Sequence, residues 1–277
     1  MKKIFMALCM VAFAVVGCGD DESWSPSARA NDEPGVESSS SGVTPQSSDS
    51  ETSVSTGTMT DSRDGQTYRT VKIGTQTWMA ENLNYAYTGV PYNYSGNTSD
   101  STSWCYKNEP ENCAKYGRLY TWAAAMDSVG TWTTNGKGCG YNKTCSPTYP
   151  VRGVCPSGWH LPDTTEWKTL FMAVGGVQDE DYACWWHGAG TALKSTSGWK
   201  KSGNGTDAFG FSALPAGGRY SGGSYSNEGI YADFWSSTER NSNDAYRMHL
   251  GYDDDADLYC SYKHSGRSVR CLKDGAE

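Results

Sequence analysis

The chain has 277 residues, a formal net charge of -8 and an aromatic content of 13%. An acidic protein repels phosphate backbones, which argues against nucleic acid as a partner. Its 32 glycines, low charge content and many aromatic rings are more typical of a secreted, strand-rich protein than of a cytosolic helical enzyme.

The first residues carry the pattern of a secretory signal. Lys2 and Lys3 precede an apolar run at residues 4–16, which is too short to cross a bilayer because a spanning helix needs about 20 residues. The run ends in two valines, Gly17 and Cys18, and this ending resembles the lipobox of bacterial lipoprotein precursors. The alternative is an ordinary signal peptide that is cut nearby and leaves Cys18 as a spare thiol.

The lipobox resemblance implies a signal peptide at residues 1–17 and lipidation of Cys18. Two or more acyl chains hold a protein firmly on a membrane that it does not span. Loss of the two lysines of the signal peptide would change the formal net charge from -8 to -10. We expect a lipid-anchored outer-membrane protein that faces either the periplasm or the outside of the cell.

Residues 18–60 are predicted to form a flexible stalk. They are rich in Ser, Thr, Asp and Glu and contain few large apolar residues, so they cannot bury enough surface to offset the entropy of ordering. Residues 19–22 resemble the acidic signal that sends some lipoproteins to the cell surface.

A folded domain is predicted at residues 61–273, followed by a short tail at residues 274–277. Strand-like segments, separated by turn residues, are Tyr68–Ile73, Thr77–Leu83, Phe211–Leu214, Phe234–Ser237, Tyr246–Leu250 and Ser268–Leu272. A helix is expected after Pro162, where Asp163 and Glu166 form a capping-box pair, with a shorter helix at residues 121–128 and a turn at 188–195. This pattern predicts an α+β fold, in which two or three short helices pack on a twisted antiparallel sheet with long disulfide-stapled loops.

Eight cysteines remain after the signal peptide and the lipidated cysteine are set aside, and they allow 105 disulfide connectivities. Turn residues flank the cysteines of two local pairs, Cys105–Cys113 and Cys139–Cys145, and favour both. Among the possible pairings of the other four cysteines, we prefer Cys155–Cys271 and Cys184–Cys260.

An acidic run lies between two strand-like segments near the C-terminus. Its default interpretation is a solvated hairpin tip. The alternative is a calcium site at Asp253, Asp255 and Asp257, because Ca²⁺ prefers oxygen ligands. Beyond this calcium alternative, the sequence indicates no metal and no cofactor.

The predicted domain contains a series of short phrases in a fixed order. They are Asp64–Tyr68, Ile73–Asn84, Tyr116–Trp122, Cys155–Pro162, Phe211–Arg219, Phe234–Glu239 and Val269–Cys271. Together they resemble the Fibrobacter succinogenes major paralogous domain family over residues 61–273. That resemblance implies an exported, often lipidated protein without an assigned activity. The helix entry and the C-terminal ending are also similar to C-type lectin-like folds and to the formylglycine-generating enzyme family.

No catalytic constellation accompanies this resemblance. A nucleophile elbow, a phosphate-binding loop and a zinc-protease helix motif are all missing from the sequence. The paired active-site cysteines of the formylglycine-generating family would fall on Cys260 and Cys271, which are more simply explained as disulfide partners.

Aromatic residues in Gly/Ser/Asn-rich or Cys-flanked stretches are the strongest candidates for ligand contacts, because flat rings stack on sugars. The candidates are Trp185, Trp186, Trp199, Tyr220, Tyr225 and Tyr231. The adjacent pair Trp185-Trp186 should point in opposite directions if the segment is extended. The alternative is that these rings fill a loop-rich core.

We therefore expect a non-catalytic module that binds a polysaccharide or a surface protein on a C-type lectin-like scaffold. One alternative is a structural envelope protein without a specific ligand. Another is an enzyme related to the formylglycine-generating family.

Overall fold

The structure is a computed structural model that describes residues 54–94 and 97–275. The predicted signal peptide, the lipidation site Cys18 and the stalk up to residue 53 lie outside these ranges. Within them, every helix is too short or too polar to cross a membrane.

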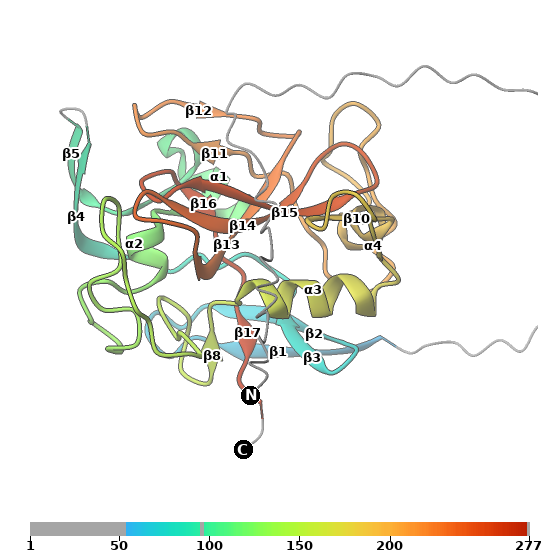
Figure 1. The fold of residues 1–277 in the computed structure, drawn as a ribbon, viewed down its shortest axis with the longest axis horizontal. Helices are drawn as coiled ribbons and strands as arrows, with labels where there is room; N and C mark the ends of the chain where they lie inside the picture. The colour runs from blue at the N-terminus through green and yellow to red at the C-terminus, as the bar shows by residue number, and fades with distance from the viewer. Residues whose placement is uncertain (1–53, 95–96, 276–277) are drawn as a thin grey trace, which may run out of the picture. The chain divides into compact units, whose positions relative to one another are not determined.

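A five-stranded antiparallel sheet forms one layer of the domain (Figure 1). Its strands, in spatial order, are β1 (Ser55–Thr60), β2 (Thr67–Ile73), β3 (Gln76–Met79), β17 (Leu272–Lys273) and β8 (Trp159–His160). β1 begins inside the stretch predicted to be stalk. Its Ser- and Thr-rich side chains are mostly exposed and it is ordered by backbone pairing with β2, so it shows no apolar pattern in the sequence.

An eight-stranded sheet forms the other layer. Its order is β6 (Ser103–Trp104), β7 (Leu119–Tyr120), β16 (Arg267–Ser268), β13 (Ala232–Glu239), β14 (Asp244–Leu250), β15 (Ala256–Tyr262), β10 (Trp185–His187) and β9 (Val177–Gln178). Neighbouring strands are antiparallel except for the parallel pair of β13 and β16. Two hairpins stand apart from both layers, β4 (Thr88–Tyr94) with β5 (Asn97–Ser101) and β11 (Gly218–Arg219) with β12 (Tyr225–Ser226).

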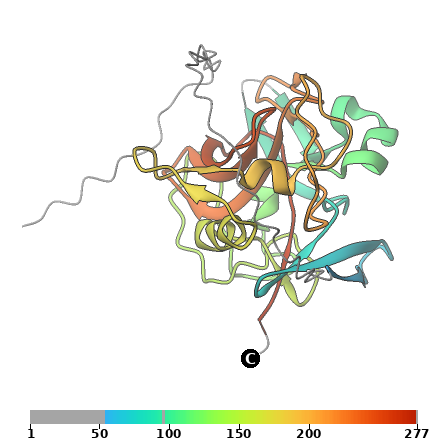
Figure 2. The same cartoon turned by 90° about the vertical axis from the view of Figure 1, so that its right-hand side faces the viewer.

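The helices are short and confirm the predicted α+β class. They are α1 (Pro110–Tyr116), which follows the 3-10 turn η1 (Tyr106–Asn108), α2 (Trp122–Ala125), α3 (Thr164–Ala173) and α4 (Ala189–Leu193). The three predicted helical segments correspond to α2, α3 and α4, while α1 was not predicted. Figure 2 shows α1 (green) at the edge of the domain beside the β11–β12 hairpin, away from the central α3.

The helix α3 lies between the two sheets and fills the space that their inner faces leave (Figure 1). Its buried residues Trp167, Leu170 and Phe171 join one core cluster with apolar side chains of both sheets. Trp167 stacks on Trp78 of β3, with ring centroids 4.6 Å apart. The predicted capping box is present, because Asp163 accepts from the Glu166 N–H and Glu166 accepts from the Asp163 N–H.

A second core cluster packs behind the first around α2 and the C-terminal segment. It contains Trp122, Trp159 and Trp235, three tryptophans of the family phrases. Two strand predictions need correction in this part of the chain. Phe211–Leu214 forms no strand and makes only a single bridge, between Ala213 and Lys194, and Ser268–Leu272 is divided between β16 and β17.

Three of the four predicted disulfides are confirmed: Cys105–Cys113, Cys139–Cys145 and Cys155–Cys271. The pair Cys184–Cys260 is wrong, because Cys260 carries a free thiol and Cys184 is bonded elsewhere. The register of β10 and β15 explains this difference. Trp185 pairs with Asp257 and the Cys184 carbonyl accepts from the Leu258 N–H, so Cys260 lies two residues too far along β15. Two residues of strand span about 6.6 Å, which together with the spacing between strands exceeds the reach of a disulfide.

The capping box of α3 allows a direct test of the helix that joins the two sheets. Replacing Asp163 with Ala should lower the free energy of unfolding by about 1 kcal/mol, since the Glu166 N–H loses its acceptor. Denaturant unfolding measures this change. The matched control is Met172→Ala at an exposed position of the same helix, which should leave stability nearly unchanged.

Candidate functional site

The side of the eight-stranded sheet that faces away from α3 carries polar and aromatic residues. Alternation along a strand turns successive side chains to opposite faces. Phe234, Met248 and Leu258 therefore enter the first core cluster, while their neighbours in sequence lie on the other face. Arg247 and His249 of β14 alternate with buried apolar residues and are half-buried on this other face.

The strand register aligns four residues of this face in a line across β13, β14, β15 and β10. Asp233 is opposite His249, His249 is opposite Asp257, and Asp257 is opposite Trp185. We call these four residues the cross-strand row. Because paired residues on adjacent strands have Cβ atoms about 5 Å apart, the row forms one continuous strip of side chains.

Asp233 is the buried and neutralised end of the row. It forms an ion pair with Arg247, and its Oδ1 lies 2.7 Å from Nδ1 of His249 while its Oδ2 lies 3.5 Å from Nε of Arg267. Burial opposes ionisation of this carboxyl group, but the two guanidinium groups and His249 outweigh burial and hold its pKa well below the usual range. Asp233 is therefore a structural anion that orients the cations around it.

Asp257 differs from Asp233 because no ion pair in the described part of the chain compensates for its burial. Its Oδ1 is buried and has no hydrogen-bond partner among the residues that the structure describes. Burial raises the pKa of this group to about 6, against the opposing influence of His249 and Arg247. Unpaired buried polar groups are rare and cluster at functional sites, so Asp257 is the most informative residue of the row.

Aromatic rings surround the middle of the row. The Tyr231 ring packs on His249 with centroids 4.8 Å apart, and the Arg247 guanidinium lies 5.7 Å from the Tyr259 ring centroid. Tyr220, at the end of β11, lies 5.2 Å from the guanidinium of Arg267. All three tyrosines are half-buried, so part of each ring remains accessible.

The hairpin that carries Tyr220 needs a glycine to approach the row. A Cβ atom at Gly218 would lie 1.9 Å from Nη1 of Arg267, so a larger residue here would displace the guanidinium from its present position. This contact connects the loop region to the buried anion Asp233 through Arg267.

Trp185 forms the other end of the row together with an exposed tyrosine. The rings of Trp185 and Tyr182 are stacked, with centroids 5.5 Å apart, and Tyr182 is 56% exposed. His187 fixes the loop between β9 and β10, because its ring nitrogens lie 2.9 Å from carboxylate oxygens of Asp179 and Asp255. A pair of stacked rings is thus held beside the unpaired carboxylate.

The six aromatic candidates separate into three groups. Trp185, Tyr220 and Tyr231 lie at the cross-strand row. Trp186 and Trp199 are 5% and 7% exposed in the first core cluster, which removes them as ligand contacts. Trp185 and Trp186 do point to opposite faces, as predicted. Tyr225 instead packs on Tyr106 at 5.3 Å and donates to Oδ1 of Asn108 at 2.7 Å.

The three calcium candidates are not brought together. Asp255 binds His187, Asp257 lies in the row, and Asp253 is exposed in the turn between β14 and β15. In residues 54–94 and 97–275, no three acidic, His or Cys side chains form a group that could hold a metal ion. Sequence reasoning missed Asp233, Tyr182 and Tyr259, because only the pairing of strands reveals that they share one face.

The family model for the Fibrobacter succinogenes major domain matches residues 71–273, and the chain belongs to this family. No curated protein and no solved structure matches the chain. The resemblance to C-type lectin-like folds stays a prediction.

Asp257 should reduce stability at neutral pH. Because its folded pKa is above its unfolded value of 3.8, the folded protein loses stability as the pH rises from about 4 through about 6. Asp257→Asn should therefore raise the melting temperature by a few degrees at pH 7 and leave it unchanged at pH 4. Calorimetry at the two pH values measures this effect. Asp254→Asn, at an exposed position in the turn that precedes β15, is the matched control, and its effect on the melting temperature should not depend on pH.

Proposed function

We propose that this protein is a lipid-anchored outer-membrane lipoprotein whose folded domain binds a glycan at the cross-strand row without catalysing a reaction. The anchor is Cys18, supported by the lipobox pattern that ends there. The acidic stretch that follows would connect the anchor to the domain, on either the periplasmic or the outer face of the membrane.

One observation carries the assignment of a glycan ligand: Asp257, whose Oδ1 has no hydrogen-bond partner among the described residues, lies opposite the half-buried Trp185, which stacks on the exposed Tyr182. A carboxylate oxygen only accepts hydrogen bonds, and sugar hydroxyls are donors. The faces of Trp and Tyr offer apolar area next to polar groups, which suits the C–H faces of sugar rings. Asp257 and the opposite ring pair of Trp185 and Tyr182 together supply both kinds of contact that a glycan uses.

The electrostatics of the row support binding over hydrolysis. Glycosidases use two carboxyl groups, one of which must transfer a proton to the leaving group. Asp233 cannot take either role, because it is buried, ionised and enclosed by Arg247 and Arg267. Asp257 alone supplies an acceptor for a ligand but no acid–base pair.

The enzyme alternative from the formylglycine-generating family finds little support in the cysteines. Cys271 is fully buried in a disulfide with Cys155, and Cys260 is half-buried with its sulfur 3.0 Å from Nη1 of Arg240. These two cysteines do not form a free dithiol. A purely structural envelope role predicts a row that binds no glycan.

Glycan binding is tested with the mature full chain on a glycan array and in polysaccharide pull-downs. Asp257→Asn and Trp185→Ala should each weaken retention at least tenfold, while Asp254→Asn should leave it unchanged. Retention on no glycan would contradict the proposed ligand. Retention that both row variants keep would place the binding site elsewhere.

Binding should also depend on pH in a defined direction. Protonation of Asp257 removes the ligand's acceptor, so affinity should fall as the pH drops from 7 to 5, across a pKa of about 6. Asp233 stays ionised over this range, and Arg247 and His249 are the basic groups that act on Asp257. Calorimetric titration measures the affinity. In Asp257→Asn, any residual affinity should lose this dependence, and a dependence that persists would show that Asp257 is not its source.

A further inference from the structure

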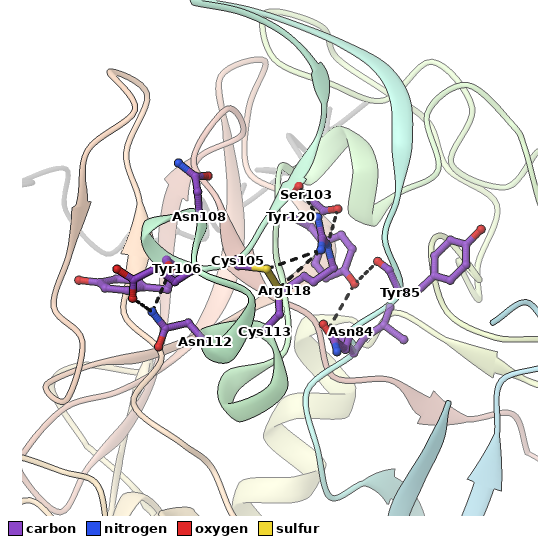
Figure 3. Close-up of a disulfide and its surroundings, with 12 residues drawn as sticks. Asn84, Tyr85, Ser103, Cys105, Tyr106, Asn108, Asn112, Cys113, Arg118 and Tyr120 are labelled. Atoms are coloured by element: carbon purple, nitrogen blue, oxygen red, sulfur yellow. Dashed lines mark hydrogen bonds between the residues drawn. A yellow bond between two sulfur atoms is a disulfide. The ribbon is translucent and has the colours of Figure 1, made fainter. Parts of the chain in front are cut away.

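The Cys105–Cys113 disulfide lines a surface hollow that contains none of the residues of the cross-strand row. The Cys105–Cys113 bond, the side chain of Arg118 and residues 84–86 border a space of about 450 Å³ (Figure 3). Cys105 is half-buried and Cys113 is 7% exposed, so Cys105 is the more exposed residue of the pair.

Arg118 is held rigidly against this disulfide. Its Nε donates to Oγ of Ser103 at 3.0 Å and its Nη2 donates to the Ser103 carbonyl at 2.9 Å. These two bonds direct Nη1 toward the sulfurs, 3.7 Å from Sγ of Cys105 and 3.6 Å from Sγ of Cys113 (Figure 3). Within the described part of the chain, Arg118 forms no ion pair with a carboxylate that would neutralise it.

The other short-range disulfide lies near Glu239, a carboxylate that is itself paired with Lys263. Cys139–Cys145 closes a loop of similar length, with a sequence separation of 6 against 8 for Cys105–Cys113. The Cys145 N–H donates to both carboxylate oxygens of Glu239 at 3.2 Å. A guanidinium group beside the sulfurs stabilises a leaving thiolate at Cys105–Cys113, whereas loop length affects both bonds nearly equally.

We propose that Cys105–Cys113 is a thiol–disulfide exchange site that accepts two electrons from a dithiol. A thiolate of the dithiol attacks Sγ of Cys105, the bond between the two cysteines breaks, and Cys113 leaves as a thiolate beside Nη1 of Arg118. The second sulfur of the dithiol then attacks the mixed disulfide and releases Cys105. The dithiol is oxidised to a cyclic disulfide, and its two protons end on the two protein thiols.

Reduction at this site would release a segment that contacts the loop region. Tyr106 of η1 packs on Tyr225, Asn108 accepts from the Tyr225 hydroxyl, and the Tyr116 hydroxyl of α1 donates to Glu228 at 3.2 Å. These contacts hold the β11–β12 hairpin, which also carries Tyr220. Exchange at Cys105 is therefore positioned to change the order of a loop that borders the cross-strand row.

The test is a titration of the mature full chain with dithiothreitol, after the free thiol of Cys260 has been blocked. Newly formed thiols are alkylated and mapped by mass spectrometry. Cys105–Cys113 should be reduced at a dithiothreitol concentration at least threefold lower than Cys139–Cys145. Simultaneous reduction of the two bonds, or earlier reduction of Cys139–Cys145, would overturn the proposal.

Two further measurements separate the charge of Arg118 from its packing. Arg118→Met should raise the dithiothreitol concentration that reduces Cys105–Cys113 at least threefold. Arg118→Lys keeps the positive charge, so it should be reduced at nearly the same concentration as the wild type. If Arg118→Met fails to fold, the wild type alone decides. Raising the ionic strength from about 0.05 to about 1 M should narrow the gap between the two disulfides, since salt screens the Arg118 charge. A gap that does not respond to salt would contradict the role of this guanidinium.

Discussion

The C-terminal segment that runs from β16 to β17 is shared by both sheets, and a buried arginine holds it in place. Arg270 is 1% exposed and forms no ion pair with a carboxylate among residues 54–94 and 97–275. Its Nη2 and Nε donate to Oδ1 of Asn82 at 2.6 and 3.2 Å, and its Nη1 donates to the Phe211 carbonyl. The guanidinium also lies 4.3 Å from the Phe211 ring centroid. Burial lowers the pKa of Arg270 to about 9. Carbonyl oxygens and aromatic faces surround this cation in place of solvent. The adjacent Cys271 is covalently fixed to Cys155.

The position of this segment determines where the candidate site can form. β16 beside β13 and β17 between β3 and β8 set the two sheets at the separation that α3 fills. One face of the larger sheet is then committed to the core, and every second residue of β13, β14 and β15 is turned to the opposite face. That face holds a buried ion pair at Asp233 and, at Asp257, a carboxylate whose Oδ1 has no hydrogen-bond partner among the described residues. The pKa of Asp233 is lowered and that of Asp257 is raised, although both residues belong to one row.

Several features could be predicted from the sequence because local rules govern them. The capping box of Asp163 and Glu166, the apolar face of α3 and the opposite directions of Trp185 and Trp186 all follow from short-range geometry. Other predictions failed where the outcome depends on distant segments. The Cys184–Cys260 prediction failed because it depends on a strand register that no local pattern reveals. Trp199 lies in a loop-like stretch of the sequence, but its indole N–H donates to Oγ of Ser195 and to the Ala213 carbonyl in the core.

The sequence by itself determined the family, the α+β class and the identity of the aromatic and acidic residues available for binding. These depend on ordered motifs, periodicity and spacing, which are properties of the chain in one dimension. Only the tertiary structure decided which of those residues meet. Strand pairing joined Asp233, His249, Asp257 and Trp185 across four strands and left one carboxylate oxygen without a partner, because the distance between side chains depends on register and not on separation along the chain.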